Sequence, residues 1–244
     1  MIKAFALMER DFRVFFADRF LLVIMFVNFS IDLAVSGLTL SSMLRNVGFN
    51  YFLYIAPGAN LVTATVAAFQ AVRDVWRERV IHDTQPYLLT LPFRKSTFAA
   101  SRLMSGMLRA TLTTVPGTAV ICWLYGLNAP LCGFAVLIMF VFSGAVCGLS
   151  VVAASLASSL ELFATVRSTV QVYLSVFSTQ FYPASYLPPA VLTLSNFNPM
   201  TWAVQSFRLL QTGTVDVGLL VPLCGISAML LGAGFLLFMR SMRF

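Results

Sequence analysis

Residues 131–157 read LCGFAVLIMFVFSGAVCGLSVVAASLA, a stretch without a single Lys, Arg, Asp or Glu. A helix needs roughly 20 apolar residues to cross the hydrocarbon core of a bilayer. This stretch is long enough, and the spacing of Gly144 and Gly148 allows a second helix to approach closely. We therefore expect a transmembrane helix here, and an integral membrane protein around it.

The same pattern recurs along the whole chain of 244 residues. Hydrophobic residues make up 59% of the chain and charged residues only 10%, whereas soluble domains carry about 25% charged residues. Six spans and their connections use nearly the whole length, so we expect one all-α transmembrane domain over residues 1–244. The expected spans are about 20–40, 52–72, 103–125, 131–157, 162–181 and 217–239.

Three segments do not fit a membrane span. Phenylalanines recur at near-helical spacing in residues 1–19 with charged residues between them, which is typical of a helix lying on the membrane surface. Residues 73–101 are the longest polar connection. Residues 182–216 carry several prolines, so they are too interrupted to span but too apolar to be a free loop. We expect short re-entrant helices there, because non-helical backbone at membrane depth must be buried in protein or face water.

The distribution of Lys and Arg predicts the orientation. With both termini in the cytoplasm, thirteen of the 16 basic residues lie inside and only Arg45 and Arg208 lie outside, while Arg109 falls within a span. Cytoplasmic loops carry such an excess of basic residues, so we expect a multi-pass protein of a prokaryotic cytoplasmic membrane. The inside residues are Lys3, Arg10, Arg13, Arg19, Arg73, Arg77, Arg79, Arg94, Lys95, Arg102, Arg167, Arg240 and Arg243.

Several function classes lack their residues. A P-loop requires Gly before its Lys, but Lys95-Ser96 follows Arg94, so we expect no nucleotide site in this chain. The only histidine, His82, lies in the polar connection rather than beside a nucleophile within a span, which argues against an intramembrane protease. The net charge of +7 comes from basic residues scattered between spans, so we expect no nucleic-acid partner.

The four cysteines have no metal-binding spacing. They lie in or beside apolar runs, without a CxxC pair. We expect them to be small apolar thiols rather than zinc ligands or a disulfide framework. No cofactor is expected in this chain. The cysteines are Cys122, Cys132, Cys147 and Cys224.

The 73–101 connection mixes charges with bulky apolar groups. A purely solvated loop has no need of Trp76 or of several leucines. One interpretation is a docking surface for a cytoplasmic partner, with apolar anchors inside a charged rim. The other is a helix lying in the headgroup layer. Composition alone leaves both open.

Polar residues also occur inside the expected spans. Ser168, Gln171, Ser175 and Ser178 are spaced 3, 4 and 3 residues apart, which predicts one helical face. Such a face lines a pathway or forms an interface between helices held by hydrogen bonds. In the first span, Asn28 and Asp32 interrupt the apolar run; Asp32 is either functional or paired structurally, and Arg109 is best explained as structural.

Four stretches together resemble the permease subunits of type-2 ABC exporters. Tyr54-Ile55-Ala56-Pro57-Gly58 is similar to the family's aromatic–apolar–Pro-Gly signature. Leu89-Thr90-Leu91-Pro92 is similar to its coupling region. Phe181-Tyr182-Pro183 resembles its outer turn after the fifth span. Asn198-Pro199-Met200-Thr201-Trp202, ending at Phe207-Arg208, resembles its Asn-Pro-(Leu/Met)-Thr-aromatic…Arg signature.

This resemblance implies two copies of the chain, which dock two P-loop ATP-binding subunits that hold ATP and Mg. The 73–101 connection would contain the coupling helix, and residues 182–216 would close the exit. One departure is Gln205, where many relatives carry an acidic residue. The implied ATPase-coupling residues are Trp76, Arg77, Glu78, Arg79, Asp83, Thr84 and Leu89; the implied outer gate comprises Tyr182, Pro183, Asn198, Pro199, Trp202 and Arg208.

We therefore expect the membrane subunit of an ATP-driven exporter, itself without enzymatic activity, in contact with membrane lipids. Its pathway would lie between two copies and be lined by the first, second and fifth spans, with Asn28, Asp32 and the polar face of the fifth span as candidates. The substrate would be a hydrophobic drug, a lipid or a lipid-linked glycan. The alternative is a stand-alone secondary transporter or channel that uses Asp32 and Arg109 as coupling charges. An intramembrane enzyme would need a nucleophile–base pair that the sequence lacks.

Overall fold

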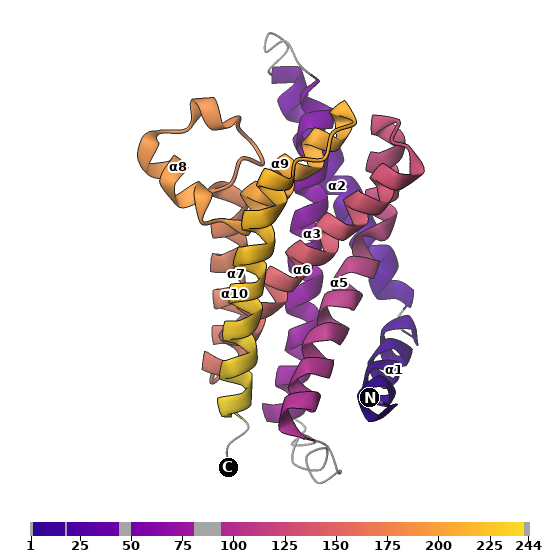
Figure 1. Ribbon diagram of the computed structural model, residues 1–244, viewed down its shortest axis with the longest axis vertical. Helices are drawn as coiled ribbons and strands as arrows, with labels where there is room; N and C mark the ends of the chain where they lie inside the picture. The colour runs from indigo at the N-terminus through magenta and orange to yellow at the C-terminus, as the bar shows by residue number, and fades with distance from the viewer. Residues whose placement is uncertain (1, 18, 44–49, 81–93, 242–244) are drawn as a thin grey trace.

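The computed structural model describes residues 2–17, 19–43, 50–80 and 94–241. Within these ranges the chain is helical, without a β-strand. The long helices run side by side, with α1 and the C-terminal end of α10 at one end and α8 and α9 at the other (Figure 1). We call these the α1 end and the α9 end. The helices are α1 (Ile2–Ala17), α2 (Arg19–Met43), α3 (Tyr51–Val80), α5 (Lys95–Tyr125), α6 (Ala129–Leu156), α7 (Leu160–Val176), α8 (Pro189–Asn196), α9 (Pro199–Leu209) and α10 (Val217–Ser241), with short 3₁₀ turns at Ala184–Tyr186 and Leu210–Thr212.

Five helices in the described ranges are long and apolar enough to cross a membrane, and they confirm five of the six expected spans. The segments are Leu22–Thr39, Tyr51–Glu78, Lys95–Tyr125, Ala129–Leu156 and Val217–Ser241. The expected fifth span coincides with α7, which has 17 residues. It packs against α3, α6 and α9. At 1.5 Å per residue α7 is about 26 Å long, at the lower limit for crossing a hydrocarbon core.

The boundaries of the polar connection were predicted wrongly. Helix α3 continues through residue 80 and α5 already begins at residue 95, so the ends of the expected 73–101 loop are helical. The physical reason is that residues such as Trp76 and Phe98 have buried positions against neighbouring helices, and this packing extends both helices beyond the bilayer. Residues 81–93 lie outside the described ranges.

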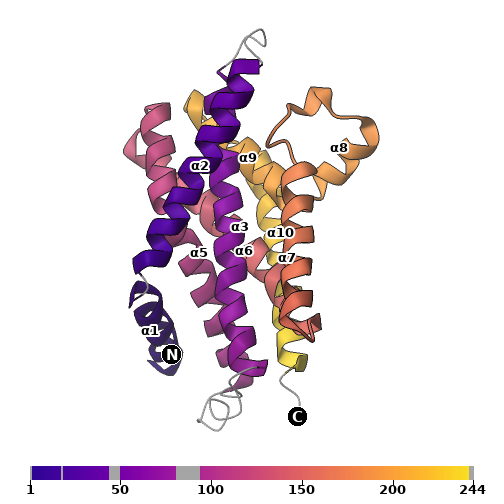
Figure 2. The same cartoon turned by 180° about the vertical axis from the view of Figure 1, so that it is seen from behind.

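Helix α3 lies at the centre of the fold. It packs against α2, α5, α6, α7 and α9, and Figure 2 shows it between α2 and α7. Deep in the bundle, the fully buried Asn60 donates from Nδ2 to Thr118 Oγ1 on α5 at 2.9 Å. Gly117 makes room for this contact, because a Cβ at that position would lie 2.4 Å from Asn60 Oδ1. The side-chain N–H of a polar residue within a span thus finds its partner on the neighbouring helix.

Helices α6 and α10 cross closely at glycines, as the spacing of Gly144 and Gly148 predicted. A Cβ at Gly148 would lie 2.4 Å from the Leu230 carbonyl oxygen, and one at Gly234 would lie 2.7 Å from the Gly148 carbonyl oxygen. The two backbones are therefore in direct contact, which only glycine permits at these positions.

We expect Gly148→Ala to destabilise the protein by about 1–3 kcal/mol, since the added methyl must push the α10 backbone away. Gly225→Ala on α10 is the matched control, because no atom lies within 4 Å of the Cβ it would add. Thermal unfolding of both variants in the same detergent measures the difference. Equal midpoints for the two variants would contradict the close crossing.

Candidate functional site

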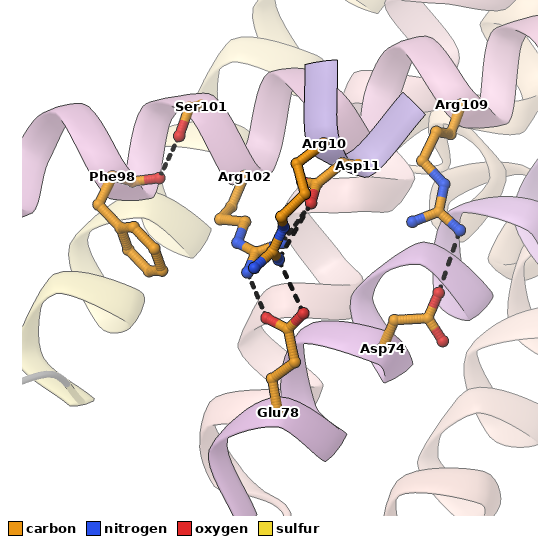
Figure 3. Close-up of polar contacts among 8 residues, drawn as sticks. All are labelled: Arg10, Asp11, Asp74, Glu78, Phe98, Ser101, Arg102 and Arg109. Atoms are coloured by element: carbon orange, nitrogen blue, oxygen red, sulfur yellow. Dashed lines mark hydrogen bonds and ion pairs between the residues drawn. The ribbon is translucent and has the colours of Figure 1, made fainter. Parts of the chain in front are cut away.

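A network of ion pairs joins α1, α3 and α5 at the α1 end of the bundle (Figure 3). Arg102 is at its centre, with only 6% of its side chain exposed. It donates to Asp11 Oδ1 of α1 at 2.8 Å and to Glu78 of α3 through its other terminal nitrogen. Arg10 also donates to Glu78, at 2.8 Å, and to Asp11 at 3.2 Å. We call Arg10, Asp11, Glu78 and Arg102 the ion network.

A second ion pair lies next to the ion network. Arg109 of α5 donates to Asp74 Oδ2 of α3 at 3.0 Å, and its guanidinium carbon lies 5.2 Å from the centroid of the Phe15 ring on α1. A polar cavity of about 300 Å³ lies among these groups and also reaches Ser105 and Gly106. Arg109 and Asp74 thus neutralise each other between α5 and α3, which agrees with the structural interpretation of Arg109.

Trp76 anchors α3 to the connection between α6 and α7. Its ring is 3% exposed, its Nε1 donates to the Ala157 carbonyl oxygen at 3.2 Å, and it stacks on Phe163 with ring centroids 6.4 Å apart. The expectation that an aromatic residue here points outward as a docking anchor is not supported by this burial. The side chain instead fixes the end of α3 against α7.

The other residues predicted to couple to an ATPase have different locations. Arg77 is exposed, and Glu78 belongs to the ion network. The backbone of Arg79 is part of α3. Asp83, Thr84 and Leu89 lie outside the described residues.

At the α9 end, Arg208 of α9 binds the backbone of two other segments. It donates to the Tyr54 carbonyl oxygen at 3.0 Å, to that of Thr179 at 2.8 Å and to that of Gln180 at 2.8 Å. Its guanidinium carbon lies 3.4 Å from the centroid of the Tyr54 ring. Among the described residues no carboxylate pairs with it, so main-chain carbonyls and a ring face stabilise its charge.

Two tyrosines near Arg208 also donate to main-chain carbonyl oxygens, and burial changes the pKa of the arginine itself. Tyr51 donates to the Phe181 carbonyl oxygen at 2.6 Å. Tyr125 donates to the Leu53 carbonyl oxygen at 2.9 Å. Burial lowers the pKa of Arg208 to about 10, so the group remains protonated at neutral pH.

The Pro-Gly pair of the sequence also has a clear role: Gly58 lies against Gln180, where a Cβ would be 2.3 Å from the Gln180 side chain. We call the contacts of Arg208 with residues 54, 179 and 180 the Arg208 clasp.

The predicted gate residues gather around this clasp. Asn198 caps α9 by accepting from the Met200 N–H at 2.9 Å, and it donates to the Leu174 carbonyl oxygen of α7 at 3.0 Å. Pro199 is the first residue of α9. Trp202 donates to the Asn196 carbonyl oxygen at 2.8 Å, whereas Tyr182 is exposed. Pro183 immediately precedes the 3₁₀ turn.

The predicted pathway residues lie on two helices. Asn28 and Asp32 of α2 are exposed, as is Ser168 of α7, while Gln171 and Ser175 are half-buried. Ser178 does not share their face, because α7 ends at Val176. Its hydroxyl instead donates to the Ser175 carbonyl oxygen at 2.9 Å and accepts from the Gln180 N–H at 3.2 Å, which shapes the turn toward the clasp.

Sequence reasoning missed the ion network as a unit. The available signal was that Asp74 and Glu78 are four residues apart, directly after an apolar run, and that Arg102 and Arg109 are seven apart. Each pair shares a helical face. What the sequence does not contain is which faces meet in space.

We expect Arg102→Gln to loosen α1, because it leaves two carboxylates with Arg10 alone, and breaking a buried ion pair costs about 3–5 kcal/mol. Faster chymotryptic cleavage within α1 and a lower unfolding midpoint in detergent would show it. Arg13→Gln removes an exposed pair with Glu9 and serves as the control. Cleavage rates equal to those of the control would contradict a role of the ion network in docking α1.

Arg208→Lys keeps the charge but cannot form the three-way contact. Each charge-assisted hydrogen bond contributes about 1.5–3 kcal/mol, so we expect the segment 177–183 to exchange its amide hydrogens faster. Hydrogen exchange with mass spectrometry measures this, with Arg240→Lys on the exposed end of α10 as the control. Unchanged protection of that segment would show that the Arg208 clasp does not hold it.

A family model described as "ABC-2 type transporter" matches residues 3–212. That range contains α1, the ion network, the Arg208 clasp and α7. No curated protein matches the chain.

Proposed function

We propose, from the premise that this chain belongs to the ABC-2 type transporter family, that it is the permease subunit of an ATP-driven exporter. Two copies would form the pathway, and two separate P-loop subunits would hold ATP and Mg and supply the energy. The protein would lie in the cytoplasmic membrane of a prokaryote, with the α1 end in the cytoplasm. The proposed substrate is a hydrophobic drug, a lipid or a lipid-linked glycan.

The observation that carries the proposal is a set of polar side chains within the expected spans α2 and α7. Asp32 lies 13 residues from the start of α2, and Gln171 lies 11 residues from the start of α7. These side chains are therefore about 16–20 Å along their helices, and α2 begins above the lower end of α7 in Figure 2. Polar groups exposed at such depth require protein or water opposite them.

A second copy supplies that environment best. In Figure 2, α2 and α7 flank α3 on one face of the bundle. Apolar residues surround the polar ones on this face, among them Ile31 and Val35 on α2 and Val172 on α7. Such a surface matches itself when two copies meet about a two-fold axis. Since α7 is then enclosed by protein, its 17 residues suffice for a sixth span.

The α1 end provides a route for coupling. Arg77 is exposed there, one residue before the ion-network residue Glu78, and the 81–93 connection joins the ends of α3 and α5 at this point. A force on that connection acts on both helices and, through the ion network, on α1. The gate would lie at the other end of α3, where the Arg208 clasp holds the segment after α7.

The alternative as a secondary transporter gains no support from these contacts. It requires Asp32 and Arg109 to work as a pair of coupling charges. Arg109 is committed to Asp74 on α3 and to the ring of Phe15, and Asp32 lies on the exposed surface of α2.

Disulfide crosslinking tests the pairing of copies. In a background with Ser at the four natural cysteines, one copy carries Ile31→Cys, and a second copy with a different tag carries Val172→Cys. We expect oxidation to join them into one band, and mild purification to bring along a P-loop ATPase in equal amount. Replacing Val172→Cys by Met229→Cys, on the exposed face of α10, is the control and should give no crosslink. A homo-oligomer without an ATPase would favour the secondary transporter instead, and crosslinking through α10 alone would contradict the proposed pathway.

A further inference from the structure

Two arginines on facing helices have no counter-charge in the described part of the chain. They are Arg73 of α3 and Arg167 of α7, and no hydrogen bond or ion pair to a described residue satisfies either. Arg73 Nε is buried without a hydrogen-bond partner there. Unpaired charges at membrane depth are unfavourable and rarely retained without a partner.

The packing of α3 against α7 brings the two side chains together. Phe163 of α7 lies between two rings of α3, with centroid distances of 6.0 Å to Phe69 and 6.4 Å to Trp76. Arg73 lies between Phe69 and Trp76 on the same face of α3, and Arg167 lies one turn beyond Phe163. Both arginines therefore belong to the contact between α3 and α7.

The other described arginines in this layer are paired differently. Arg102 pairs with Asp11 and Glu78, and Arg109 pairs with Asp74. Asp74 follows Arg73 directly in sequence, yet it points to α5 rather than to α7. Glu161, the acidic residue in the first turn of α7, lies six residues before Arg167 and hence on another side of that helix. Asp11 of α1 and the α3 carboxylates Asp74 and Glu78 are thus engaged on the α5 side of α3, while Glu9 of α1 pairs with Arg13.

Both arginines lie close to the α1 end of their helices. Arg73 lies seven residues before the end of α3, and Arg167 seven residues after the start of α7. Both are therefore about 10 Å from the α1 end of their helices. Helix α3 has 30 residues and is about 45 Å long, so it extends beyond a hydrocarbon core of about 30 Å at its ends. The pair then lies near the boundary of that core.

We propose that Arg73 and Arg167 together bind the phosphate group of an amphiphile from the leaflet at the α1 end. Two guanidinium forks match the geometry of one phosphate, and arginine is the residue best suited to such bidentate contact. The phosphate supplies the missing negative charge. The site itself does not depend on the proposed exporter function; only the identification of the amphiphile as a transported substrate rests on it.

Phosphatidic acid and diacylglycerol test the site, because they differ only by the phosphate. Native mass spectrometry of the purified full-length protein measures how much of each short-chain lipid it retains. We expect wild-type protein to prefer phosphatidic acid by at least about tenfold. Arg73→Gln/Arg167→Gln should abolish this preference, and Arg73→Lys/Arg167→Lys should retain part of it.

The control removes the same number of charges at the same end of the bundle. Arg94→Gln/Arg240→Gln affects two exposed arginines and should leave the preference intact. Thermal unfolding and size-exclusion profiles establish that each variant is folded. Equal retention of phosphatidic acid by both glutamine variants overturns the proposal, as does a wild-type protein without preference. A third outcome is a wild-type dimer that shows no lipid preference, together with an Arg73→Gln/Arg167→Gln variant that is a monomer. A carboxylate of the second copy is then the counter-charge, and the proposal is also overturned.

Two sources of the phosphate remain to be distinguished once binding is shown. If the amphiphile is transported, ATP and Mg added to the complex with its ATPase in vesicles should move labelled phosphatidic acid to the opposite leaflet, and the Arg73→Gln/Arg167→Gln variant should not do so. If it is a resident lipid, retention persists through ATP hydrolysis. Both results support the site. Absence of any ATPase partner would overturn the proposed function while leaving the lipid binding measurable.

Discussion

The constraint on which this structure depends is that charges and hydrogen-bonding groups at membrane depth must find partners inside the protein. Helix α3 meets this constraint at both ends. At the α1 end, Glu78 joins Arg102 and Arg10. At the α9 end, the Tyr54 carbonyl oxygen and ring receive Arg208. Between them, Asn60 donates from Nδ2 to Thr118. Because water is absent from the bilayer core, each of these contacts is difficult to replace, and together they fix the position of α3 relative to its neighbours.

This arrangement makes α3 a mechanical link between the two ends of the bundle. A continuous helix transmits displacement along its axis, and α3 runs without interruption from the Arg208 clasp to the ion network. The two ends differ in kind. The ion network joins side chains from three helices, whereas the clasp binds main-chain carbonyls of the turn after α7. A shift of α3 that lengthens the three bonds of Arg208 would release that turn, and with it the support of α9 and α8. This link is the physical basis for placing coupling at one end and the gate at the other.

The helices were predictable from sequence because hydrophobic length alone specifies a membrane span. The stretch 131–157 coincides closely with α6, and the small residues at Gly144 and Gly148 do allow α10 to approach. The same reasoning failed where packing extends a helix beyond the bilayer. From the sequence alone, Trp76 is interpreted as an exposed anchor in a polar stretch, but in the structure it is buried against Phe163. The stripe on α7 was right for Ser168, Gln171 and Ser175 and wrong for Ser178, since the length of a helix depends on where its last contacts lie. The ion pairs were beyond prediction, because the sequence shows which residues share a face but not which faces meet.

The distribution of unpaired charge separates the two sides of α3. On the side toward α5, Arg102 and Arg109 are paired with the carboxylates of Asp11, Glu78 and Asp74 around the polar cavity. On the side toward α7, Arg73 and Arg167 retain their charge, and the polar groups of α7 continue along the same helix toward the α9 end. A protein that only needed stability would be better served by apolar residues at these positions, since burying an unpaired charge is costly. On the α7 side, the proposed phosphate-bearing amphiphile would therefore neutralise the two arginines, and the proposed second copy would cover the polar face above them.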